Sequence, residues 1–397
     1  MNPSPHASSL SSPSSPGRDL VRRVQNLLAD APEEPRLVAE DLRRRLEAND
    51  RWLPLRAEIH LTKTRRSWTE ALLMRDHDLE AEVSAWLEQR GGYDEFLARY
   101  RRYDPSMASS EWPRHYPFRI LAGHGSISGG SNIFVFFPQA LGLEPRGEAD
   151  VFGFEFVDVW SNLFHETVFP CLRRAFDLTT QLEALTTLGA SLDRTVYLAA
   201  VFHEIGHRSG FWKVSPAAHP ELKISSFHRD VLGELATDSL LVKHLEEFPE
   251  LVYFVVFQRL FWFGRRGFKD DPRSALSNED NDAWIGAYLW NSLRASGAIV
   301  ATNGAWRLDA KRARASFGQI VDELDELGRR ALSVGGAGQD EILSAWMKSR
   351  VPFVEGRGFH LPAELAEIFE RCHDIVETPH FRPLVNLASF KQHGEIA

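Results

Sequence analysis

Two histidines separated by three residues on an apolar helix constrain this chain more than any other feature of its sequence. They lie in the segment AAVFHEIGHRSGF, residues 199–211, which follows an apolar, helix-compatible stretch, and Gly210 can end the helix. Residues four apart lie on the same face of a helix, so the imidazoles of His203 and His207 can reach one cation. Glu204 follows the first histidine directly and could accept a proton from a water molecule that such a cation acidifies. We therefore predict a metal-binding helix.

The pattern His-Glu-x-x-His resembles the signature of the zincin metallohydrolases at all three of its positions. The metzincin branch adds a third histidine, but this chain has Lys213 there, which cannot bind a metal while protonated. The gluzincin branch takes a glutamate from a following helix, and the segment HRDVLGELATDSLLVKHL, residues 228–245, offers Glu234 and Asp238 four residues apart. The resemblance to gluzincins covers residues 196–241. It implies Zn²⁺ bound by His203, His207 and Glu234, with Glu204 as general base and Asp238 as hydrogen-bond acceptor from a ligand imidazole.

Other assignments of the third ligand remain open. His228 or Asp230 could take the place of Glu234, and the acidic pair of Glu234 and Asp238 could simply form an exposed helix face. The pairing of a histidine helix with a glutamate helix is also similar, more weakly, to that of dipeptidyl peptidase III. The motif of that family has one more residue between its histidines.

Residues outside the two helices could complete a substrate site. Zincin clefts are bordered by an edge strand, and residues 129–137, GGSNIFVFF, are our candidate, with Asn132 as a hydrogen-bonding partner of a substrate backbone. A plain structural hairpin is the alternative for this segment. A hydrolytic site also needs a donor for the developing oxyanion, for which His228 and Tyr288 are candidates without a spacing argument.

The predicted fold is mainly α with a small β element (α+β), zincin-like, with the HEIGH helix packed against the glutamate helix. We expect a disordered Ser/Pro-rich tail at 1–17, a helical region at 18–110 and a zincin-like catalytic domain with a helical C-terminal part at 111–397. A Gly/Ser cluster in 118–139 suggests a hairpin or two neighbouring strands. A second hairpin is expected at 298–309, with Asn303-Gly304 at its turn. Helices are predicted in 18–50, 77–102, 310–331, 338–350 and 362–376.

Composition limits the function classes. A formal net charge of -9 leaves no basic surplus for a general nucleic-acid binder. The most apolar run, residues 251–263, is shorter than the roughly 20 residues of a membrane span, so we expect no membrane association. Only two cysteines occur and the N-terminus does not resemble a secretory signal, so we expect a cytoplasmic protein.

These features favour a zinc-dependent hydrolase that cleaves an amide bond, in a peptide or in a small amide-containing substrate. The alternative is a zinc-dependent enzyme of small-molecule metabolism that uses the zincin site for non-peptidase chemistry. A non-catalytic, zinc-stabilised binding module is a third hypothesis. The intact Glu204 argues against it, because a structural zinc site needs no base.

Overall fold

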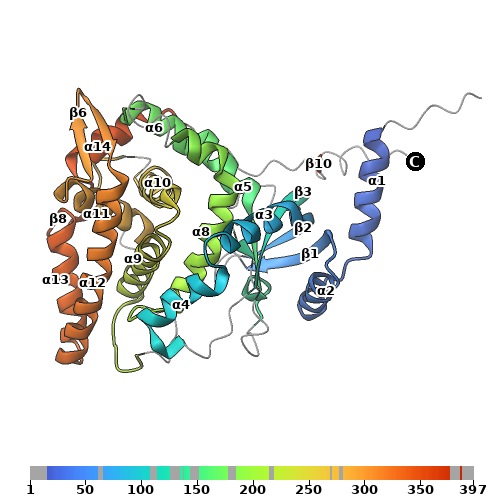
Figure 1. Ribbon diagram of the computed structural model, residues 1–397, viewed down its shortest axis with the longest axis horizontal. Coiled ribbons are helices and arrows are strands. Elements are labelled where there is room, and N and C mark those ends of the chain that lie inside the picture. Colours follow the sequence, from blue (N-terminus) through green and yellow to red (C-terminus); the bar gives the residue numbers. More distant parts are fainter. Residues whose placement is uncertain are drawn as a thin grey trace, which may run out of the picture.

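The computed structural model describes residues 16–60, 66–107, 114–125, 135–136, 138–143, 152–177, 185–213, 219–268, 271–276, 280–375 and 385–386. Most of the tail expected at 1–17 lies outside this part of the chain. Figure 1 shows a large helical region beside a smaller region built on one sheet. This agrees with the predicted fold class of mainly α with a small β element. None of the helices described has the length and apolar character that a membrane crossing requires.

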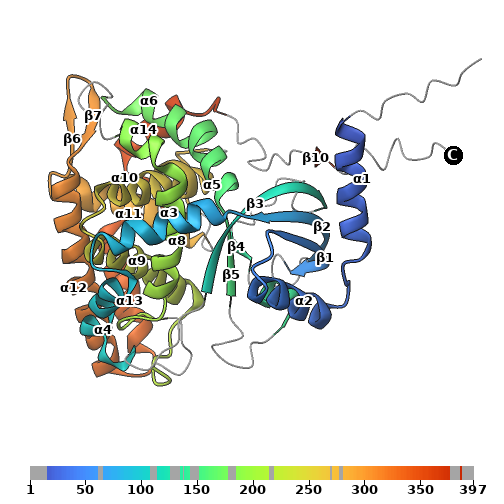
Figure 2. The ribbon, with the colours of Figure 1, turned by 45° about the vertical axis from the view of Figure 1, so that its right-hand side comes forward.

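The main sheet has the strand order β1-β2-β3-β5-β4, and β10 pairs with β3 outside this path. The pairs β1/β2, β2/β3 and β4/β5 are antiparallel, whereas β3/β5 and β10/β3 are parallel. Figure 2 shows α1 and α2 on the outer side of this sheet and the helical region on its other side. The strands are β1 (Trp52–His60), β2 (Arg66–Arg75), β3 (Arg114–Gly125), β4 (Val135–Phe136), β5 (Phe152–Phe156) and β10 (Val385–Asn386).

Two features of this sheet differ from the sequence-based expectation. The β1/β2 hairpin was not predicted, because β2 contains the helix-favouring run EALLM and five successive buried residues that show no alternation. The strands of 118–139 were expected to form a hairpin or to be neighbours, but β5 lies between β3 and β4. Because β2 pairs with β3, the sheet also joins strands from both sides of the boundary expected near residue 110.

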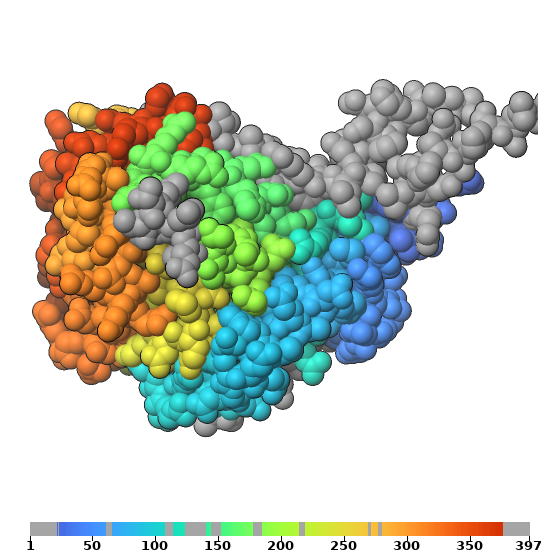
Figure 3. Space-filling model, turned by 45° about the horizontal axis from the view of Figure 1, so that its top comes forward, coloured from blue at the N-terminus to red at the C-terminus, as the bar shows by residue number. Residues whose placement is uncertain are grey.

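The helical region surrounds the long helix α9, which contacts α8, α10, α11, α12 and α13. Figure 3 shows one face of the molecule, on which the blue and cyan residues of α3 and α4 lie directly against the helical region. The helices are α1 (Pro16–Ala29), α2 (Pro35–Glu47), α3 (His77–Glu88), α4 (Tyr93–Tyr103), α5 (Val157–Leu163), α6 (Phe169–Ala175), α8 (Leu192–Gly206), α9 (Ser226–His244), α10 (Pro249–Gln258), α11 (Asn281–Ala295), α12 (Ala310–Val334), α13 (Gly338–Arg350) and α14 (Ala363–Arg371). Short 3₁₀ turns are η1 (Pro105–Met107) and η2 (Pro138–Leu141), and two π-helical turns are η4 (Phe164–Val168) and η5 (Arg259–Gly264).

Several local predictions agree with these elements. The apolar run 251–263 is buried within α10 and η5, as expected for a core helix. The hairpin at 298–309 is present as β6 (Ile299–Thr302) and β7 (Ala305–Leu308), and Asn303 and Gly304 both have positive φ at its turn. A second small hairpin joins β8 (Phe353–Val354) to β9 (Gly358–Phe359).

Candidate metal centre

The predicted histidine helix is α8, and it ends at the motif itself. His203 and Glu204 lie in its last turn, and His207 is the residue that caps its C-terminus. Gly206 lets α8 approach α9 closely, because a Cβ atom there would lie 2.9 Å from Cγ2 of Thr237. The motif therefore places both imidazoles against α9.

Helix α9 supplies the carboxylate that faces both imidazoles. Oε2 of Glu234 lies 3.5 Å from Nε2 of His203, and Oε1 lies 3.3 Å from Nε2 of His207. A tetrahedral zinc ion binds nitrogen and oxygen ligands at about 2.0–2.2 Å, which places neighbouring ligand atoms about 3.3–3.6 Å apart. These two separations, and the nitrogen and oxygen donor atoms, are compatible with such an ion.

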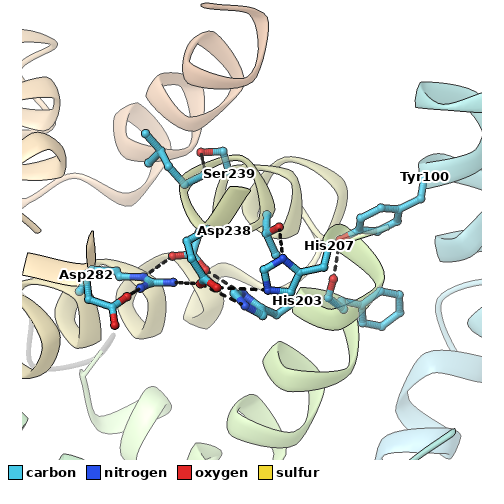
Figure 4. Close-up of polar contacts among 11 residues, drawn as sticks. Tyr100, His203, His207, Asp238, Ser239 and Asp282 are labelled. Atoms are coloured by element: carbon cyan, nitrogen blue, oxygen red, sulfur yellow. Dashed lines mark hydrogen bonds and ion pairs between the residues drawn. The ribbon is translucent and has the colours of Figure 1, made fainter. Parts of the chain in front are cut away.

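The opposite nitrogen of each imidazole is held by α9 as well. Nδ1 of His203 lies 3.0 Å from Oδ1 of Asp238, and Nδ1 of His207 lies 3.2 Å from Oγ1 of Thr237. Figure 4 shows Asp238 and His203 pointing toward one another, with His207 beside them. Partners of this kind fix the ring orientation of metal-binding histidines and leave Nε2 available.

Arg259, the first residue of η5, joins these groups into one network, and sequence reasoning missed it. Its guanidinium donates through Nε to Asp238, through Nη1 to Asp282 and through Nη2 to Glu234. The glycine at position 286 allows α11 to approach η5 closely. A Cβ atom on Gly286 would lie 2.6 Å from the carbonyl oxygen of Arg259. The signal in the sequence was a single arginine inside the apolar run 251–263.

The charges of this network shift the ionisation of its members. Burial opposes the charged form of His203, but the hydrogen bond with Asp238 and the charge of Glu234 outweigh it and raise the pKa of His203 to about 9. Burial also opposes the charged form of Glu234, yet His207, His203 and Arg259 hold its pKa well below the ordinary value. Burial raises the pKa of Asp282 to about 6 despite its contact with Arg259. The positive charge of His203 and the negative charge of Glu234 therefore stabilise each other.

A cavity of about 340 Å³ opens beside these groups. Its polar side contains His203, Glu204 and Glu234, and its apolar side includes the aromatic rings of Trp160 and Phe254. Glu204 therefore shares one cavity with two of the three predicted ligands. Its other lining residues are Glu155, Val196, Ala199, Ala200, Leu241, Gln258, Arg259, Phe263, Asn281 and Asp282.

The candidates for substrate binding lie elsewhere. The ring of His228 lies 2.6 Å from Oδ1 of Asp340 through Nδ1 and 3.3 Å from Oγ of Ser344 through Nε2. Tyr288 is buried and its ring packs against Trp284. Neither His228 nor Tyr288 lines the cavity that contains Glu204. A larger cavity of about 1050 Å³ borders Asp340 and Ser344 but none of the predicted zinc ligands.

The remaining sequence candidates are also separate from the cluster. Asn132 lies outside the described residues, and of the expected edge strand 129–137 only β4 is described. Asp230 is exposed on α9, whereas Lys213 binds Asp104 through Nζ at 3.0 Å. Within the described part of the chain, His203, Glu204 and His207 form the one cluster of histidine, cysteine and acidic side chains compact enough to hold a metal ion, and Glu234 adjoins it.

No protein-family model matches this sequence, and no curated protein resembles it at a significant level. Solved structures with a similar fold include the following two. DPP III from Caldithrix abyssi superposes with a TM-score of 0.58 and 11% identity, over 95% of this chain and 72% of that chain. Dipeptidyl-peptidase III from Corallococcus sp. strain EGB superposes with a TM-score of 0.53 and 11% identity, over 96% of this chain and 70% of that chain. At this identity the likeness shows the fold alone. Of the two families that the sequence resembles, dipeptidyl peptidase III was the one with the weaker resemblance.

Proposed function

We propose that this protein is a zinc-dependent hydrolase that cleaves an amide bond, with Zn²⁺ held by His203, His207 and Glu234. One observation carries the proposal. Nε2 of each histidine faces one oxygen of Glu234, at 3.5 Å and 3.3 Å, which are the separations expected around a tetrahedral zinc ion. Glu204 lines the same cavity as His203 and Glu234, and we therefore assign it the role of general base. A purely structural zinc site would need no such base.

The residues of the chain divide the chemistry among them. Zinc at this site would polarise the substrate carbonyl and acidify the attacking water molecule. The carboxylate of Glu204 takes a proton from that water and then delivers it to the nitrogen of the leaving amine. Asp238 and Thr237 keep the two imidazoles oriented through their Nδ1 atoms. Arg259 fixes the carboxylates of Glu234 and Asp238.

A short peptide is the substrate class that we propose. The two structures with a similar fold carry the name of a dipeptidyl-peptidase, and the cavity of about 340 Å³ is large enough for a few residues only. The same small volume favours the second candidate, in which the zinc site acts on the amide of a small metabolite. Peptide and small-amide substrates can be compared directly on one preparation.

The decisive experiment combines metal analysis with activity. Wild-type protein and the variant Glu204→Gln are purified, loaded with zinc and assayed on short peptides and on small amides. We expect one zinc ion per chain in both proteins and hydrolysis by the wild type alone. His203→Ala should lose most of its zinc, because two ligands hold the ion poorly, whereas Lys213→Ala should keep it. Full zinc content in His203→Ala would refute the metal assignment, and full activity in Glu204→Gln would refute the general base.

A further inference from the structure

Two residues that line the metal cavity carry buried oxygen atoms without a hydrogen-bond partner in the described part of the chain. They are Glu155, from β5, and Gln258, the last residue of α10. Buried polar atoms are nearly always paired, so an unpaired atom beside a cavity calls for an explanation. Neither residue belongs to the network of Arg259 or takes part in the proposed proton transfer.

Gln258 lines the cavity from the end of α10. It is 6% exposed, its Oε1 has no partner, and Phe254 and Phe263 line the cavity on either side of it in sequence. An apolar side chain at this position would leave no polar atom unpaired. The neighbouring Arg259 binds three carboxylates. Oε1 of Gln258, in contrast, accepts no hydrogen bond from any described residue.

Glu155 is fully buried and only half satisfied. Its Oε1 lies 2.9 Å from Nδ1 of His115, and its Oε2 has no partner among the described residues. Burial raises the pKa of Glu155, and the contact with His115 offsets this only in part. The carboxylate therefore lacks a donor on the side of its second oxygen.

The charge of the cavity indicates which chemical group these oxygens could receive. Arg259 is the only lysine or arginine among the described lining residues, and its three nitrogens are all bound to carboxylates. No lysine or arginine among the described lining residues is thus left to bind a substrate carboxylate. Glu155 and Gln258 each offer a hydrogen-bond acceptor, and an acceptor takes an N–H or O–H group as its partner. The backbone of a peptide substrate supplies N–H groups.

We infer that Glu155 and Gln258 form a subsite that binds an N–H group of the substrate beside the metal centre. The inference rests on the proposed function for the identity of the bond cleaved, but the subsite itself can be tested by binding alone. An amide N–H and a free amino group share this chemistry, and the substrate analogues below distinguish them. A substrate anchored by a free carboxylate is not expected in this cavity.

The test uses zinc-loaded Glu204→Gln protein, which should bind peptides without turning them over. Calorimetry gives the dissociation constants of a tripeptide, of its analogue methylated at the amide nitrogen that precedes the scissile bond, and of its N-acetylated analogue. We expect at least one of the two modified peptides to bind about 10-fold more weakly or worse, because a buried acceptor then stays unpaired. Loss on methylation identifies an amide N–H, and loss on acetylation identifies the amino group.

Adding Gln258→Met to the Glu204→Gln protein should reduce the preference for the unmodified tripeptide over its modified analogues to less than about 3-fold. The methionine keeps the volume of the side chain and removes the acceptor. Glu155→Gln, which retains an oxygen acceptor but not the charge, should weaken binding of a free amine more than that of an amide. Gln89→Met, at an exposed position, is the matched control and should leave the preference unchanged. Equal binding of all three peptides, no binding of any, or a preference that survives Gln258→Met would overturn the inference. Selective binding without hydrolysis by the wild type would refute the proposed function and leave the subsite standing.

Discussion

Nη2 of Arg259 lies 2.8 Å from Oε2 of Glu234, so the carboxylate that faces the two imidazoles also accepts a hydrogen bond from a buried guanidinium. The same oxygen faces His203, and the other oxygen faces His207. Arg259 therefore orients Glu234 and balances its charge. This relationship connects the stability of the helical region with the geometry of the proposed metal centre.

Arg259→Met should destabilise the metal-free protein strongly. The substitution leaves the buried carboxylate of Asp238 and the half-buried carboxylates of Glu234 and Asp282 without their common cation. Removing one partner of a buried ionic network costs about 3–5 kcal/mol in free energy of unfolding, which urea denaturation in the presence of a chelator measures. Arg266→Met, at an exposed position nearby, should change it by less than about 0.5 kcal/mol. Similar losses in both variants would contradict the account of the network.

Asp238→Asn should retain zinc but bind it about 10–100-fold more weakly, because the amide orients His203 less well. Competition with a chromophoric chelator measures this affinity on protein shown to be folded by circular dichroism. Asp230→Asn, on the exposed side of the same helix, provides the control and should have no effect. The opposite result, with zinc lost only in Asp230→Asn, would favour the alternative ligand.

The stability of the metal-free protein should depend on the ionisation of His203. Its pKa rises from 6.5 to about 9 in the folded state. A group whose pKa is raised on folding stabilises the protein fully below its unfolded pKa, and this contribution is lost as the pH rises through the folded pKa. The difference in unfolding free energy between wild type and His203→Gln should therefore fall between pH 6.5 and 9. A difference that stays constant over this range would show that His203 is not charged in the fold.

Gly206→Ala should disturb both folding and metal binding. The new methyl group would meet Thr237, whose side chain holds His207, so α8 and α9 must separate or Thr237 must turn away. Overpacking of this kind costs about 1–3 kcal/mol. Thermal unfolding and zinc titration measure the two effects. Gly318→Ala, where the added Cβ meets nothing within 4 Å, should instead leave zinc binding intact and stabilise α12 slightly.

The sequence was informative where function depends on local spacing. His203 and His207, and likewise Glu234 and Asp238, are four apart on predicted helices, and the structure brings these two pairs together. Tertiary packing decided the rest. Arg259 reaches the site because α11 and η5 pack closely. Thr237 lies between Glu234 and Asp238 in the sequence, and its residue type did not mark it as a partner of His207.

The substrate site could not be predicted in the same way. His228 and Tyr288 had the right chemistry but no spacing that tied them to the metal, and the structure places them outside the metal cavity. Glu155 enters it from β5, a short strand of five residues. The position of such a residue depends on how its strand pairs with strands from other parts of the chain. Local sequence patterns do not determine this pairing.

The most direct test of the ligand set is an anomalous difference map at the zinc absorption edge, from crystals of the zinc-loaded protein. We expect a single peak about 2.0–2.2 Å from Nε2 of His203, Nε2 of His207 and the carboxylate of Glu234. The absence of a peak at this position in zinc-saturated crystals would contradict this ligand set. So would a peak bound by His228 or Asp230 in place of Glu234.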